Sequence, residues 1–147
     1  MAIDRLRAVF DTNVIVAALK SRNPHSPTKE LLRRWASAEF DLLHSSGLRE
    51  EYEEVLTASD VWPDAAHAFL ADLTQTGILV QVAVVEPIIE ADPDDDQVLA
   101  CALAGRATHL VTYDPHFQPL GEEYRGIKIL DGLHFLYLVR GDTLPDS

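Results

Sequence analysis

The chain has 147 residues, of which 47% are hydrophobic and 24% charged, a balance that fits one globular domain and excludes a disordered polypeptide. Its formal net charge of −12 excludes nucleic-acid binding that is driven by overall positive charge. A nucleic acid would bind only where bound cations make the local charge positive. The single cysteine, Cys101, and the lack of a signal-peptide core or a long apolar run predict a cytoplasmic protein without membrane contact.

The first half of the chain alternates short apolar runs with amphipathic segments, a pattern typical of strands followed by helices. Thr28 is the expected cap of the second helix, and the Ser45-Ser46-Gly47 turn supplies the cap of the third. The expected strands are residues 6–10 and 40–44, and the expected helices are residues 14–19, 28–38 and 48–57.

The second half continues the alternation. Gly77 ends one helix, Asp92 and Pro93 open the next with a cap and a first-turn proline, and Asp131 caps the last. The expected strands are residues 78–85, 108–112 and 127–130, and the expected helices are residues 63–76, 93–104 and 132–138.

Strands that alternate with helices, and that are continuous apolar runs, predict an α/β fold. We expect a three-layer α/β/α sandwich with a central, mostly parallel sheet in residues 1–140, followed by a polar tail in residues 141–147. Ligands of such sheets bind beyond the carboxyl ends of the strands. Asp11 and Asp114 both follow expected strands at that edge, although aspartate is also common in turns and caps.

Two further carboxylates lie on helices and border the expected core. Glu51 is three residues from Leu48 and four from Val55, so it flanks the apolar stripe, although a solvated acidic face explains it equally well. Asp95 is in line with Val98 on the inward face of its helix, where an unpaired carboxylate is costly. Favourable placement at a helix N-terminus does not account for that inward position.

Four carboxylates at one sheet edge would repel one another unless protons or cations intervened. Carboxylate and water ligands suit Mg²⁺ or Mn²⁺ better than zinc. One or two such ions would activate water and stabilise the charge that develops on a phosphodiester. The sequence therefore predicts a metal-dependent hydrolase that needs no nucleophile of its own, in keeping with the lack of a nucleophile elbow or a Gly-rich phosphate loop.

The order and spacing of four segments resemble the PIN-domain nucleases, and within them the VapC-like toxins of toxin–antitoxin systems. The resemblance spans nearly the whole chain and rests on Val9–Val14, Glu51–Leu56, Asp92–Asp96 with Ala100–Ala102, and Leu110–Asp114. It implies an endoribonuclease that uses Mg²⁺ or Mn²⁺ and is silenced by a small antitoxin protein. A homodimer is also expected, and the final helix offers a candidate surface for the second copy or for the antitoxin.

Carried over residue by residue, the resemblance makes Asp11, Glu51, Asp95 and Asp114 the acidic quartet that holds the metal and carries catalysis. Asn13 and Thr112 match polar positions that orient the carboxylates. The aspartate-rich run leaves Asp92 and Asp96 as alternates for the third ligand. Pro115 and His116 depart from the family pattern directly after Asp114.

A basic segment lies between residues 20 and 34 of this acidic chain. We expect it to follow the RNA backbone, although a solvated helix face explains it equally well. Its proposed substrate-binding residues are Lys20, Arg22, Arg33 and Arg34. The six histidines show no ligand spacing and are interpreted as structural or exposed.

Two other functions compete with the nuclease. A haloacid-dehalogenase-like phosphatase would need a second aspartate two residues after the first, and Asn13 stands there. A non-catalytic PIN-like binding module would use the acids only as helix caps and would bind no divalent ion.

Overall fold

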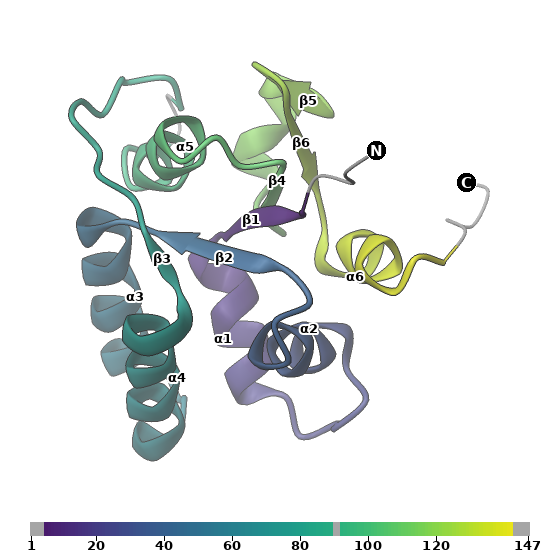
Figure 1. Cartoon of the computed structure of the whole chain (residues 1–147). Helices are drawn as coiled ribbons and strands as arrows, with labels where there is room; N and C mark the ends of the chain where they lie inside the picture. Colours follow the sequence, from purple (N-terminus) through teal and green to yellow (C-terminus); the bar gives the residue numbers. More distant parts are fainter. Residues whose placement is uncertain (1–4, 90–91, 143–147) are drawn as a thin grey trace.

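A six-stranded sheet forms the centre of the molecule in the computed structural model, which describes residues 5–89 and 92–142 (Figure 1). The strand order is β3-β2-β1-β4-β6-β5, and every pairing is parallel except that of β5 with β6. The strands are β1 (Arg7–Phe10), β2 (Asp41–His44), β3 (Ile78–Leu79), β4 (His109–Val111), β5 (Glu123–Tyr124) and β6 (Ile127–Leu130). The predicted mostly parallel sheet is therefore confirmed.

Helices lie on both faces of this sheet and complete the predicted sandwich. Helix α5 contacts β1, β2 and β4 on one side, whereas α1, α3 and α4 lie on the other (Figure 1). The helices are α1 (Thr12–Lys20), α2 (Pro27–Ala36), α3 (Ser46–Ala58), α4 (Pro63–Thr76), α5 (Asp95–Ala104), the 3₁₀ helix η1 (Pro115–Leu120) and α6 (Gly132–Arg140). No helix in residues 5–89 or 92–142 has the length and apolar character needed to span a membrane.

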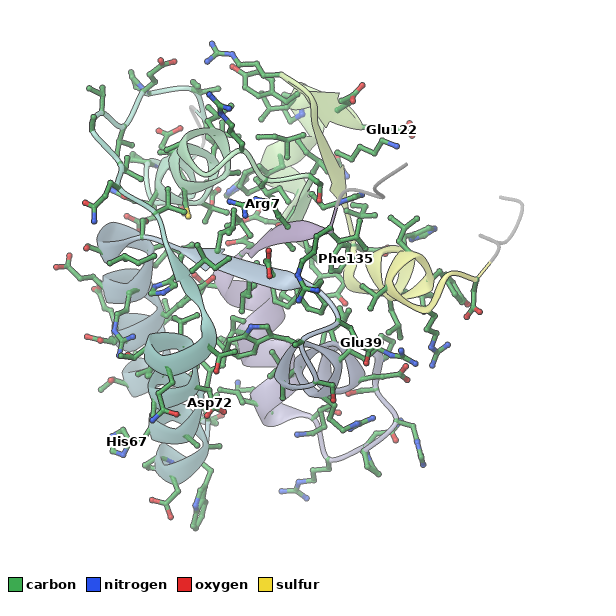
Figure 2. All side chains as sticks on the ribbon, viewed as in Figure 1. Arg7, Glu39, His67, Asp72, Glu122 and Phe135 are labelled. Carbon is green, nitrogen blue, oxygen red and sulfur yellow. The ribbon has the colours of Figure 1, made fainter. Side chains whose placement is uncertain are left out.

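Aromatic side chains pack the centre of the sheet against α6. Phe135 of α6, labelled in Figure 2, is fully buried, and its ring centroid lies 6.0 Å from that of Phe10 and 5.2 Å from that of Phe40. Both contacts are edge-on, the arrangement that the quadrupoles of aromatic rings favour. The Tyr52 hydroxyl of α3 donates to the carbonyl of Phe10, which ties the end of β1 to the helix that carries Glu51.

Side-chain caps fix where the helices begin. Asp131 accepts a hydrogen bond from the backbone N–H of His134, as expected of the cap of α6. Ser26, rather than the predicted Thr28, caps α2, because Pro27 takes the first helical position. Helix α1 starts at Thr12, two residues earlier than predicted, since Asp11 serves as its cap.

The segment from residue 78 to residue 94 differs most from prediction. The expected strand 78–85 is wrong beyond Leu79, because β2 ends at His44 and its carbonyl makes a last hydrogen bond with Val80 N. Val80 is still buried, but Val84 is 73% exposed, so the end of this apolar run is not buried in the sheet. Helix α5 begins at Asp95 with Asp94 as its cap residue, later than the predicted start at Asp92 and Pro93. Of the predicted tail, residues 143–147 lie outside the described residues.

Candidate metal centre

Asp11 and Asp114 come together because their strands are neighbours. Phe10 of β1 is in register with Val111 of β4, and the N–H of Asp11 donates to the carbonyl of Val111 (2.9 Å). Parallel strands end at the same edge of a sheet, so the residues that follow β1 and β4 share one side of the molecule. The predicted meeting of the two strand-end aspartates is what the topology produces.

The carboxylate of Asp11 is buried and held from two sides. One oxygen accepts from the backbone N–H of Thr12 (2.8 Å), and the other accepts from the hydroxyl of Thr112 (2.6 Å). The Thr112 oxygen in turn accepts from the N–H of Asp114 (2.9 Å), so one threonine links both aspartates. Burial nevertheless raises the pKa of Asp11, the two hydrogen bonds lower it, and the Asp114 carboxylate raises it further.

Asp95 lies near these two aspartates but belongs to α5, which is on the opposite side of the sheet from α1 (Figure 1). It is the first residue of α5, and it is only 4% exposed. Asp11, Asp95 and Asp114 each offer a carboxylate oxygen, and the three oxygens lie within 4.8 Å of one another. Burial, together with Asp11 and Asp114, raises the pKa of Asp95 to about 6, although a hydrogen bond from His116 opposes the shift. We call these three residues the aspartate triad.

Glu51 lies beside the triad on α3. Burial, together with Asp11 and Asp95, raises the pKa of Glu51 to about 7. The nearby Thr12 hydroxyl lowers it, yet neither Thr12 Oγ1 nor the buried Glu51 Oε2 makes a hydrogen bond of good geometry with any described residue. A buried oxygen without a donor is costly unless a proton or a cation satisfies it. The donor set, all hard oxygen atoms, fits Mg²⁺ or Mn²⁺.

His116 is a site residue that the sequence interpretation missed. Its Nδ1 atom lies 3.0 Å from Asp95 Oδ2 and 3.2 Å from Asp114 Oδ1. The hydrogen bond with Asp95, and then the charge of Asp114, raise the pKa of His116. A second group of potential ligand atoms within 4.8 Å of one another consists of Asp92, Asp95 and His116. The only signal in the sequence was its position two residues after Asp114.

The remaining polar candidates lie around these groups. Asp96 is buried, but its Oδ1 atom accepts from the N–H groups of Ile88 (3.0 Å) and Ile89 (2.7 Å), so it fixes the segment before α5. Asn13 accepts from the N–H of Tyr113 (3.3 Å) and thus contacts the chain between Thr112 and Asp114 rather than a carboxylate. Asp92, by contrast, lies beside Asp95.

Among the described residues, none of the four basic candidates forms an ion pair with the aspartate triad or Glu51. Lys20 is the last residue of α1, and Asp11 caps the first turn, so the length of the helix, about 12 Å, separates them. Arg34 is engaged by Glu30 (2.8 Å) and Glu39 (2.6 Å). Arg22 and Arg33 are exposed.

Comparison with known proteins identifies the family. Residues 7–116 match the family model described as PIN domain, and the chain therefore belongs to the PIN-domain family, as the sequence resemblance implied. A comparison with curated proteins gives no match.

Two solved structures share the fold. The first is VapBC2 from Rickettsia felis bound to a DNA fragment from their promoter, with 14% identity and a TM-score of 0.58 over 84% of this chain and 98% of that chain. The second is FitAcB from Neisseria gonorrhoeae, with 14% identity and a TM-score of 0.53 over 86% of this chain and 99% of that chain. At this identity the likeness concerns the fold alone, and it confirms the predicted PIN-like architecture.

Proposed function

We propose that this chain is a metal-dependent endoribonuclease and the toxin of a toxin–antitoxin pair. The observation that carries the proposal is the aspartate triad, whose three carboxylate oxygens lie within 4.8 Å of one another. Burial and the charges of Asp11 and Asp95 also raise the pKa of the nearby Glu51. Family membership supports the nuclease class. The sequence resemblance makes these three aspartates and Glu51 the family's acidic quartet. A bound divalent cation would supply the positive charge that activates water and stabilises a phosphodiester as it is cleaved.

Each residue of the proposed metal centre has a distinct role. Asp11, Asp95 and Asp114 would hold the cation, Mg²⁺ or Mn²⁺. The Thr112 hydroxyl orients the Asp11 carboxylate and accepts from the backbone N–H of Asp114. In the metal-free protein Glu51 holds a proton up to about pH 7, because its pKa is raised that far. The ionised form of Glu51 would complete the quartet once a cation compensates its charge.

The toxin role implies a protein partner and a cytoplasmic setting. The likeness in fold to VapBC2 supports a cognate antitoxin, and the homodimer expected from the sequence is part of the same proposal. The basic residues Lys20, Arg22, Arg33 and Arg34 would contact RNA away from the metal, since the chain as a whole carries a charge of −12.

Cleavage of a mixed RNA pool by the purified chain tests the enzyme. We expect cleavage with Mg²⁺ or Mn²⁺, none with EDTA, and a loss of at least about 100-fold in Asp11→Asn, which removes a ligand rather than an outer-shell partner. Asp72→Asn is the matched control, because Asp72 is an exposed acid on α4 (labelled in Figure 2). If the wild type shows neither cation binding nor cleavage, the non-catalytic binding module is favoured.

The partner is tested separately. The protein encoded in the neighbouring reading frame should co-purify with this chain and suppress its RNA cleavage. Cleavage that persists at full occupancy of the complex would contradict the toxin role but leave the nuclease assignment intact.

A further inference from the structure

The imidazole of His116 brings a nitrogen donor into a centre that otherwise offers only oxygen atoms. Asp92, Asp95 and His116 each offer one ligand atom, and these atoms lie within 4.8 Å of one another. Asp95 also belongs to the aspartate triad, so the two groups share one buried carboxylate. Two cation positions that share a carboxylate are a common arrangement in enzymes that cleave phosphodiesters.

Local structure holds the imidazole in place. Asp114 caps η1 by accepting from the N–H of His116 (2.9 Å), and Pro115 occupies the first helical position. This turn directs the ring back toward Asp95. The His116 side chain is 39% exposed, so a hydrated ion can reach it from solvent.

The distances around Nδ1 suit a metal ligand. Neighbouring ligands of an octahedral ion with bonds of about 2.1 Å are about 3.0 Å apart. Nδ1 lies 3.0 Å from Asp95 Oδ2, the carboxylate that the two groups share, so an ion can replace this hydrogen bond with little movement of the two side chains. A hydrogen-bonding role fits the same distance but predicts that His116→Gln keeps the affinity for metal.

We propose that Asp92, Asp95 and His116 form a second cation position beside the aspartate triad, and that its nitrogen ligand makes this position prefer transition metals over Mg²⁺. The proposal rests on the metal-dependent function proposed above. Mg²⁺ favours oxygen ligands and sheds water reluctantly, whereas imidazole binding strengthens along the series from Mn²⁺ to Co²⁺ and Ni²⁺. His116 therefore determines which metals fill the centre.

Electron spin-echo spectroscopy of the full chain loaded with Mn²⁺ tests for the nitrogen ligand. We expect ¹⁴N modulation in the wild type that is lost in His116→Ala. His67→Ala is the matched control and should keep the modulation, because His67 is an exposed histidine on α4 (labelled in Figure 2). Bound Mn²⁺ without ¹⁴N modulation in the wild type, or modulation that survives in His116→Ala, would overturn the proposal.

Binding titrations separate coordination from hydrogen bonding. In His116→Ala we expect the affinity for Mn²⁺ and Co²⁺ at the second position to fall at least about tenfold, and that for Mg²⁺ about twofold or less. His116→Gln keeps a hydrogen-bond donor beside Asp95, and it should behave like His116→Ala. Recovery of Co²⁺ affinity in His116→Gln, or an equal loss for all three metals, would reduce His116 to a positioning role and overturn the proposal.

These measurements also keep the two proposals apart. If the wild type binds Mn²⁺ and cleaves RNA but lacks the nitrogen signature, the second position is refuted and the nuclease stands. If the wild type binds neither Mn²⁺ nor Mg²⁺, both proposals fail.

Discussion

Glu51 and Glu30 lie in two regions of this molecule that shift the pKa of a glutamate in opposite directions. Glu30 on α2 accepts hydrogen bonds from Arg34 (2.8 Å) and Arg140, which lower its pKa to about 2. Glu51, buried beside aspartates, has its pKa raised to about 7. Among the described residues no lysine or arginine pairs with Glu51 or the aspartate triad. The protein thus neutralises Glu30 on α2 with arginines, whereas at the sheet edge His116 is the basic side chain that pairs with the aspartate triad among the described residues.

The largest expected effect is stabilisation by metal. At about 100 times its Kd, Mn²⁺ should raise the free energy of unfolding by about 2.7 kcal/mol, because it binds only the folded chain. For a chain of this size the melting temperature should rise by about 5–10 °C. Differential scanning calorimetry with Mn²⁺ or EDTA measures the shift.

Variants in the two regions make this test specific. Asp11→Asn should abolish most of the Mn²⁺ shift, whereas Glu30→Gln should retain it, because Glu30 already has arginine partners. An equal shift in both variants would mean that the ion binds elsewhere.

The second effect is the loss in free energy of unfolding when Glu51 ionises in the absence of metal. The raised pKa means that the folded state binds this proton more tightly than the unfolded state, so stability falls as pH rises from about 4.5 to about 7. In EDTA at pH 8, Glu51→Gln should therefore be more stable than the wild type by about 1–2 kcal/mol, and the gain should vanish below about pH 4.5. Urea unfolding measures both. A destabilised Glu51→Gln at pH 8 would show that Glu51 already has a partner in the metal-free protein.

The positions of the four carboxylates at the sheet edge could largely be predicted from the sequence. Asp11 and Asp114 follow apolar strands, and parallel strands end at one edge, so topology alone brings them together. Helical periodicity selected Asp95 from a run of four aspartates, because it is in line with Val98 and Leu99. Asp95 is indeed buried, but so is Asp96, since α5 is buried on most of its surface. The same reasoning placed Glu51 at the border of the core. Whether these four residues hold a metal and carry catalysis stays a prediction.

The remaining features depend on long-range geometry. His116 reaches Asp95 only because η1 turns the chain back after Asp114, and no periodic pattern marks a six-residue 3₁₀ helix that contains two prolines. The apolar run 78–85 has the composition of a strand, yet β2 offers hydrogen bonds only as far as His44. Asp96, beside Asp95 in sequence, turns to the N–H groups of Ile88 and Ile89, a contact that sequence spacing cannot reveal.

A third prediction concerns Glu30 on α2 and its ion pairs with arginine. Glu30 has its pKa lowered to about 2, so its ion pairs stabilise the fold above about pH 4.5, and this contribution is lost as pH falls toward 2. Glu30→Gln should cost less than about 1 kcal/mol at pH 7, because partly exposed ion pairs are screened. The cost should shrink in 1 M salt and near pH 2, as measured by urea unfolding. A cost that is independent of salt would indicate lost packing rather than lost charge.

The smallest effect separates compensated from free positive charge in RNA binding. Arg33 is exposed, whereas Arg34 already pairs with Glu30 and Glu39. In an Asp11→Asn background that prevents cleavage, Arg33→Gln should weaken RNA binding about threefold and reduce the slope of log K against log salt by about 0.7, the loss of one contact to a single strand. Arg34→Gln should change affinity less, because its charge is already satisfied within the protein. If both changes leave affinity and slope unaltered, the basic segment is a solvated helix face, and the RNA is held at the metal alone.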